Sequence, residues 1–247
     1  MFFPYKDDNP RIVYPYVTYA IIALNLIVYI YQMGLGFVAS QEFTLSFGLI
    51  PATLTNIPLS EITASYAQFL SEASNTRIHL EAMPNSPFIT IFSSMFMHGG
   101  FWHLVGNMLF LWIFGDNVEG AFGHIRYAIF YILCGIGAAA GQIFIDIHSM
   151  VPMIGASGAI SGVLAAYMLR YPHARIHTFV FLFIIITTIQ VPAFIVIGIW
   201  FATQVLSGVG ALGVETGGGV AWFAHIGGFL TGVILERFFK FVRIEKY

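Results

Sequence analysis

Long apolar stretches, separated by more polar connections, set the pattern of this sequence. A helix that crosses a membrane needs about 20 mostly apolar residues. Six stretches reach or approach this length, at 16–38, 101–118, 127–145, 157–171, 191–207 and 220–239. The fourth is short and starts within a patch rich in glycine and serine. We therefore predict an all-α polytopic membrane protein, a bundle of six transmembrane helices with a short central fourth helix.

The fifth stretch is ambiguous, because apolar sequence runs from Ile176 to Leu206 with Pro192 inside it. A single helix of that length would be about 46 Å long at about 1.5 Å per residue. The hydrocarbon core of a bilayer is only about 30 Å thick. We interpret 176–190, which is rich in β-branched residues, as re-entrant or surface-lying sequence. The fifth span is then expected to begin near Val191.

The composition supports a membrane-embedded chain and excludes several other classes. Hydrophobic residues make up 58% of the sequence and charged residues only 9%, whereas soluble domains carry about 25% charged residues. The net charge of -2 comes without a basic stripe, so no nucleic-acid partner is expected. The single cysteine, Cys134, excludes an intramolecular disulfide.

The basic residues predict the orientation. With six spans, only Arg77 among the ten lysines and arginines lies on one side of the membrane. The cytoplasmic side is the side enriched in Lys and Arg, so both termini are expected to be cytoplasmic. The predicted organisation is a cytoplasmic segment at 1–15, a six-span domain at 16–241 and a cytoplasmic tail at 242–247. Within that domain, 39–100 forms a long outer loop with a short helix near 61–73.

Three groups of polar residues fall within or beside the predicted spans, where such residues are costly and are functional candidates. They are His98, His103 and Asn107 at the second span, the glycine-flanked Ser157 at the fourth, and His225 at the sixth. These three spans all enter from the outer side, and the polar residues lie near their starts. We therefore expect the groups to meet at one depth, in the outer half of the bilayer.

The spacing of these residues indicates acyl-transfer chemistry. Ser157 lies at a loop-to-helix junction, where free backbone N–H groups and the helix dipole favour an anion. His225 is placed to take the serine proton as a general base. His103 and Asn107 are four residues apart and share a helix face, so both can donate hydrogen bonds to an oxyanion. The acidic residue nearest to this depth is Asp146, and it is a weak candidate, so we predict a dyad.

Four strings resemble motifs of the rhomboid family of intramembrane serine proteases, and the resemblance extends from the first span to the sixth. GASG at 155–158 is similar to the GxSG nucleophile motif, and HLVGN at 103–107 resembles HxxxN. AHIGG at 224–228 resembles AHxxG, and Gly115, Glu119 and Gly123 match GxxxExxxG. The chain is thus similar to a bacterial-type six-span rhomboid, which implies a bacterial inner membrane with the active site opening to the outer side.

The resemblance implies cleavage of peptide bonds in or near the transmembrane segments of membrane proteins, without a metal or other cofactor. Ser157 would be the nucleophile and His225 the base, with His103, Asn107 and Gly155 in the oxyanion site. Small residues at Gly228 and Gly232 would let the sixth helix pack close to the fourth. The glycine-rich segment 208–219 would be a mobile cap.

One position departs from the family pattern. Many members place an aromatic residue four positions after the nucleophile, under the catalytic histidine, and Ser161 stands there in this chain. We therefore expect another aromatic residue, Phe223 or Tyr167, to hold His225. Glu119 is expected to make a structural contact at the cytoplasmic side.

Three other functions compete with proteolysis by serine. A zinc protease normally shows an HExxH string, which is absent here, although His98, His103 and His225 would suffice for a three-histidine site. A catalytically silent relative that binds or escorts membrane helices would lack the serine or the histidine. A transporter would carry polar residues along a path through the whole membrane, whereas these spans are polar only in the outer half.

Overall fold

The computed structural model describes residues 2–182, 185–212 and 220–239 of the chain. The helices of the bundle are α1 (Tyr16–Gly34), α5 (Phe101–Phe122), α6 (His124–Ile145), α7 (Ser157–Arg170), α8 (Ala193–Ala211) and α9 (Trp222–Glu236). Shorter elements between α1 and α5 are α2 (Phe37–Phe47), η1 (Pro51–Leu54), α3 (Leu59–Ser74), α4 (Pro87–Ser93) and η2 (Ser94–Phe96). The strands are β1 (Phe2–Asp7), β2 (Arg175–Leu182) and β3 (Ile185–Pro192).

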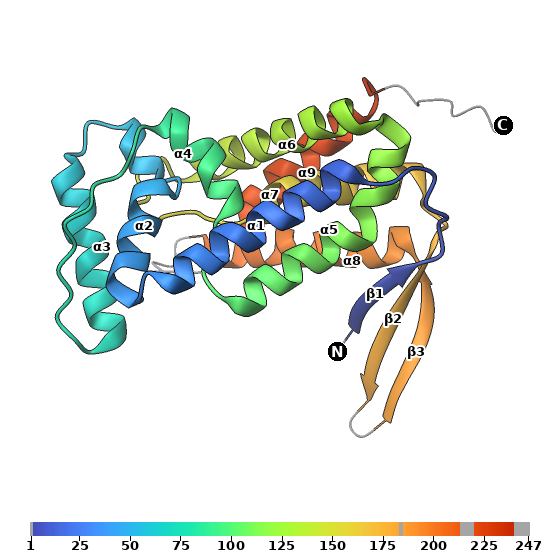
Figure 1. Cartoon of the computed structure of the whole chain (residues 1–247), viewed down its shortest axis with the longest axis horizontal. Coiled ribbons are helices and arrows are strands. Elements are labelled where there is room, and N and C mark those ends of the chain that lie inside the picture. The colour runs from blue at the N-terminus through green and yellow to red at the C-terminus, as the bar shows by residue number, and fades with distance from the viewer. Residues whose placement is uncertain (1, 183–184, 213–219, 240–247) are drawn as a thin grey trace.

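Each of the six predicted spans forms a helix, which confirms the helical class of an integral membrane protein (Figure 1). Among the described residues, α1, α6 and α8 are each long and apolar enough to cross a membrane. Helix α5 passes the same test together with 87–96, from which it is bent by 82°. Helices α7 and α9 have 14 and 15 residues and are shorter than a full span.

Helix α7 is short because it lies inside the bundle. It packs against α5, α6, α8 and α9, and every residue from Gly158 to Tyr167 is buried. At about 1.5 Å per residue the helix rises only about 21 Å. Other helices, and not lipid, cover most of its surface, so the predicted short central fourth helix is present.

Helix α9 approaches α7 through glycines. A side chain at Gly228 would collide with the backbone oxygen of Gly158, and one at Gly232 would collide with the backbone oxygen of Gly162. Small residues at such a contact let two helix backbones approach closely. The expected close packing of these helices is therefore present, and it brings the start of α9 to the start of α7.

Residues 175–182 and 185–192 form the two strands of an antiparallel β-hairpin, so 176–190 lies outside the fifth helix, as expected. The placement of this hairpin at the membrane surface stays a prediction. Strand β1 pairs with β2 and β2 with β3, both antiparallel, in the order β1-β2-β3. The sheet projects from the end of the bundle opposite α2, α3 and α4 (Figure 1). Alternate residues of β2, namely Ile176, Thr178 and Val180, are buried, as the two-residue period of a strand requires. Helix α8 begins directly after Pro192, close to the expected start at Val191.

The segment between α1 and α4 is a small helical unit and not merely a loop. Its own core contains Leu45, Ile62, Tyr66, Leu70 and Leu80. Helix α3 confirms the short helix expected near 61–73. The unit is tied to the segment before α7, because Ala52 N–H donates to the Ser149 oxygen at 3.0 Å and Leu49 bridges Met153. It therefore lies at the end of the bundle where α7 begins.

Candidate active site

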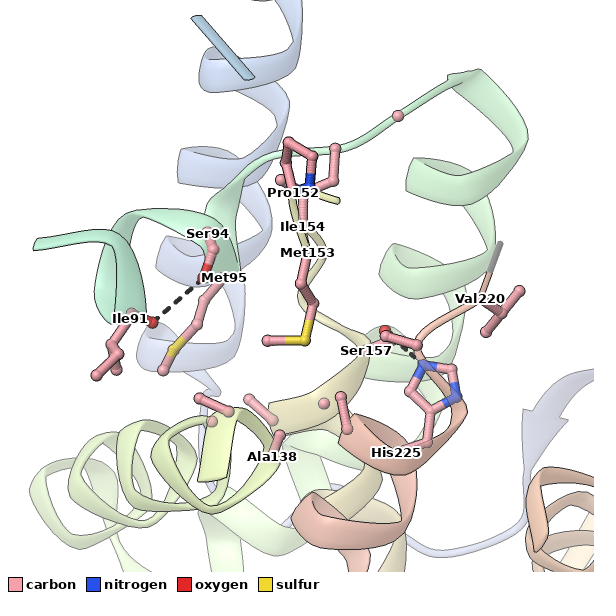
Figure 2. A pocket seen from close by; sticks show the side chains of 18 of the residues that line it. Ile91, Ser94, Met95, Ala138, Pro152, Met153, Ile154, Ser157, Val220 and His225 are labelled. Carbon is pink, nitrogen blue, oxygen red and sulfur yellow. Dashed lines mark hydrogen bonds between the residues drawn. The ribbon is translucent and has the colours of Figure 1, made fainter. Parts of the chain in front are cut away.

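Ser157 and His225 form a hydrogen-bonded pair. The Ser157 Oγ lies 2.7 Å from the His225 Nε2, although the residues are 68 positions apart in sequence. Ser157 is the first residue of α7, and His225 is in the first turn of α9. Figure 2 shows the two side chains facing each other at the edge of a cavity. The packing of α7 against α9 therefore creates the predicted nucleophile–base geometry.

The backbone before Ser157 is held in a conformation that requires glycine. Gly155 has a φ of 128°, a region that residues with a side chain rarely adopt. A side chain there would also meet the His103 ring at 2.9 Å. The Gly155 N–H donates to the Ser94 oxygen at 2.9 Å, which anchors the segment to η2. The N–H groups of the first turn of α7 have no acceptor within the helix, so the turn favours an anion beside Ser157.

The structure brings His103 to this turn, whereas Asn107 is not among the residues that line the cavity. The His103 side chain lines the same cavity as Ser157 and His225. Asn107 is buried one helical turn further along α5. Its Nδ2 has no hydrogen-bond partner among the described residues, so it is a free buried donor. His98 is also buried, and its ring packs edge-on against the His103 ring at 5.0 Å between centroids.

The cavity beside the pair has a volume of about 450 Å³. It lies between α6, the start of α7, the start of α9 and the segment that contains η2. Gly135, Ala138 and Ala139 form its wall on α6, while Met95 and Met153 extend into it from the other side (Figure 2). A mainly apolar cavity with a few convergent polar groups is typical of a ligand site.

The expectation that Phe223 or Tyr167 supports His225 was wrong. Tyr167 lies at the other end of α7, where its hydroxyl donates to Asp7 Oδ2 at 2.6 Å. The rings near the His225 imidazole belong to Trp200 and Trp222, with centroids at 5.9 and 6.3 Å. No ring contact or hydrogen bond of the described residues joins Phe223 to His225.

The second ring nitrogen of His225 also has a partner, which the sequence analysis missed. The His225 Nδ1 lies 2.7 Å from the Gln204 Oε1 on α8. The available signal was a lone amide side chain inside an apolar span, where polar residues are functional candidates. Helix α8 runs opposite to α7 and α9, so its C-terminal half reaches the depth of their first turns.

Two other residues considered from the sequence do not support the imidazole. Ser161 is buried, and its hydroxyl donates to the Ser157 carbonyl at 2.6 Å. Asp146 is exposed and caps the end of α6, and its Oδ1 accepts the His148 N–H at 3.1 Å.

The three-histidine metal alternative is weakened because both ring nitrogens of His225 are already bonded. The described residues contain no group of three or more potential metal ligands.

Glu119 makes the structural contact that was expected of it. Its side chain is fully buried and accepts hydrogen bonds from the backbone N–H groups of Val17 and Thr18 at 2.9 and 2.7 Å. The Thr18 hydroxyl donates to the same carboxylate, and the His124 Nδ1 lies 2.5 Å from it. The carboxylate thus satisfies the first N–H groups of α1, at the end of α5 remote from Ser157.

Known proteins share the part of the chain that carries this site. The sequence profile of the family described as Rhomboid domain matches residues 85–240, more than half of the chain. The "Rhomboid protein 1, mitochondrial" of Saccharomyces cerevisiae is 32% identical over 151 residues, covering 59% of this chain and 40% of the yeast protein. The "RHOMBOID-like protein 4" of Arabidopsis thaliana is 32% identical over 146 residues, covering 59% of this chain and 32% of its own.

A bacterial protein is similar as well. The "Rhomboid protease GluP" of Bacillus subtilis is 36% identical over 122 residues, which cover 49% of this chain and 23% of that protein. The chain spans less than half the length of each of these three relatives. The family match at 85–240 includes α5 to α9 and the residues of the candidate site.

Proposed function

Because this chain belongs to the rhomboid family, we propose that it is an intramembrane serine endopeptidase that cleaves peptide bonds in or near the transmembrane segments of membrane proteins. The observation that carries this proposal is the 2.7 Å contact between the Ser157 Oγ and the His225 Nε2 at the edge of a cavity. A serine in contact with a histidine base is the arrangement that nucleophilic acyl transfer requires. The printed name of the Bacillus subtilis relative, a rhomboid protease, supports the same reading.

The proposed reaction starts when His225 Nε2 accepts the Ser157 hydroxyl proton while Oγ attacks the scissile carbonyl carbon. The carbonyl oxygen becomes an oxyanion beside the N–H groups of the first turn of α7. His103 and the free Asn107 Nδ2 are the side-chain donors proposed for this oxyanion. The protonated His225 then gives its proton to the leaving amine, which leaves an acyl group on Ser157. Water activated by the neutral His225 hydrolyses that ester and restores both groups.

The surroundings of the site support the proposed substrate class. The cavity wall on α6 consists of small apolar residues, and the bundle around it is apolar. A peptide that reaches Ser157 therefore has to tolerate an apolar environment, as segments from transmembrane helices do. The proposed partners are transmembrane substrates and the lipid bilayer.

The proposed topology keeps both termini in the cytoplasm and opens the site to the outer side, as the basic residues predict. The matched relatives include a mitochondrial yeast protein, a plant protein and a bacterial protein. Since these come from a yeast, a plant and a bacterium, and the name of the yeast protein places it in mitochondria, the expected bacterial inner membrane stays a prediction from the sequence. The alternative, a silent protein that escorts membrane helices, is disfavoured because both Ser157 and His225 are present and in contact.

The test is cleavage of a transmembrane reporter by the purified chain in lipid vesicles. The wild-type protein should cut the reporter within or beside its membrane segment, and Ser157→Ala should abolish the cut while the melting temperature is kept. The neighbouring Ser161→Ala serves as a matched control, since it removes a hydroxyl that bonds only to the Ser157 carbonyl among the described atoms. Equal cleavage by Ser157→Ala and wild type would contradict the proposal.

A further inference from the structure

Gln204 is the buried amide that contacts the catalytic histidine from outside the family motifs. It lies on α8 and is 5% exposed, and its Oε1 is 2.7 Å from the His225 Nδ1. No carboxylate of the described residues is recorded in contact with His225. The side chain therefore occupies the place that an acid occupies in a three-membered catalytic site.

The hydrogen bonds of Gln204 fix which way its amide faces. Its Nε2 lies 3.1 Å from the Trp200 carbonyl oxygen, and a carbonyl can only accept. The same Nε2 lies 3.1 Å from the Thr203 Oγ1, whose own hydrogen goes to the Trp200 oxygen at 2.6 Å. Both contacts require the amide nitrogen on this side. The amide oxygen is left to face His225.

This orientation determines the tautomer of His225. An amide oxygen accepts and cannot donate, so the His225 Nδ1 must carry the proton in this contact. In a neutral imidazole the other nitrogen, Nε2, then holds a lone pair. That lone pair faces the Ser157 Oγ at 2.7 Å. The chain of contacts from Trp200 through Gln204 thus prepares the base to accept the serine proton.

We propose that Gln204 is a positioning residue that sets the tautomer and ring orientation of His225 in place of an acid. This inference rests on the proposed protease function. The rings of Trp200 and Trp222 restrict the tilt of the imidazole, but ring faces do not distinguish Nδ1 from Nε2. Only the amide oxygen makes that distinction. A neutral amide also avoids the desolvation penalty that a buried carboxylate would carry before the histidine is charged.

The experiment compares kcat, KM and the pH profile of reporter cleavage for three variants in vesicles. Gln204→Leu keeps a similar volume but removes the acceptor, so kcat should fall about 10-fold to 100-fold, the equivalent of one lost buried hydrogen bond, with KM nearly unchanged. Gln204→Glu restores an acceptor and should recover most of kcat. Its negative charge stabilises the imidazolium, so the acidic limb of the kcat profile should move to higher pH. Gln68→Leu, on the exposed face of α3, is the matched control and should behave as wild type.

Several outcomes would overturn the inference. One is a kcat for Gln204→Leu equal to that of wild type, and another is a folded Gln204→Glu protein no more active than Gln204→Leu. If Gln204→Leu does not fold, the pH profile of kcat for Gln204→Glu still tests the inference. An acidic limb at the same pH as in wild type would contradict the contact with His225. A wild-type chain without Ser157-dependent cleavage would instead overturn the proposed function.

Discussion

Helix α7 has a polar cluster at each end, and the two clusters differ in kind. At its start, His225 contacts Ser157 through one ring nitrogen and Gln204 through the other, and all three side chains are uncharged in the proposed resting state. Near its end, the Tyr167 hydroxyl joins Asp7 and Asn9, and the nearby end of α5 carries Asp116 and Glu119. The second cluster holds carboxylates, and Arg11 pairs with Asp116 at 3.2 Å.

The presence of buried polar atoms without a hydrogen-bond partner does not distinguish the two clusters. They occur at both ends, for example Asn107 Nδ2 at one and Asp116 Oδ1 at the other. The difference is the cavity of about 450 Å³ at the start of α7 and the contact at its edge between Ser157 and His225, the proposed nucleophile and base. A buried carboxylate such as Glu119, which accepts several N–H and O–H groups, holds elements together. A neutral pair beside an open volume has room to react.

The largest predicted effect is a loss of cleavage when His225, in the cluster at the start of α7, is substituted. His225→Ala removes the proposed base, so reporter cleavage should fall by about 10³-fold or more, with the melting temperature nearly unchanged. His173→Ala removes an exposed histidine beside Phe194 and should leave cleavage intact. Cleavage rates and thermal melts of both variants check the prediction. A His225→Ala protein with near wild-type cleavage would remove the base from the account.

Asn107 and Asn117 allow the same comparison within one helix, because both lie on α5 and both are buried. Asn107→Ala removes a proposed oxyanion donor, so kcat should fall about 100-fold while substrate binding is kept. Asn117→Ala, at the other end of the helix, should affect only the melting temperature. Steady-state kinetics on both proteins test this. Equal losses of kcat in the two variants would show that α5 contributes packing and not a specific donor.

For Glu119, near the carboxylate cluster at the end of α7, we predict the reverse: a loss of stability without a loss of kcat. Glu119→Ala leaves the N–H groups of Val17 and Thr18 without their acceptor, which should cost about 3 kcal/mol of stability. The kcat of the folded fraction should stay close to wild type. Denaturation of the vesicle-free protein in detergent, followed by kinetics, measures both quantities. A loss of kcat at unchanged stability would place Glu119 in the catalytic machinery instead.

The smallest effect concerns Asp7 in β1. Burial, together with the nearby Asp116 charge, raises the pKa of Asp7 to about 6, so the folded chain holds this proton more tightly than the unfolded chain. The stability contribution of Asp7 should therefore fall as pH rises between the unperturbed pKa of 3.8 and the folded pKa of about 6. Asp7→Asn keeps an acceptor for Tyr167 but does not titrate. The difference in melting temperature between the two proteins should thus change across this window, and a constant difference would contradict it.

The six bundle helices were predictable because long apolar runs in a membrane protein permit little else. The hairpin 175–192 was not, because a short apolar run rich in β-branched residues fits a strand and a buried helix segment equally well. Its pairing with β1 also depends on a segment more than 160 positions away. The internal core of the unit containing α2 and α3 depends on tertiary contacts, which the sequence pattern does not reveal. Of the helices in this unit, only α3 was predicted from the sequence.

In the candidate site, too, some residues could be predicted from the sequence and others depend on the tertiary arrangement. Ser157, His103 and His225 could be grouped because each lies near the start of a span that enters from one side. Gln204 lies in the second half of α8, so its depth matches theirs only when the opposite direction of that helix is considered. The cap expected at 208–219 is helical as far as Ala211, and 213–219 lies outside the described residues.

The most direct test of the account is to identify the residue that reacts with a fluorophosphonate, a reagent that labels activated serines. The wild-type protein should carry the adduct on the peptide that contains Ser157, as mass spectrometry of the labelled protein would show. Labelling should be lost in Ser157→Ala and strongly slowed in His225→Ala, because the hydroxyl then lacks its base. An adduct on another residue, or labelling that persists undiminished in Ser157→Ala, would contradict the claim that Ser157 and His225 are the reacting pair.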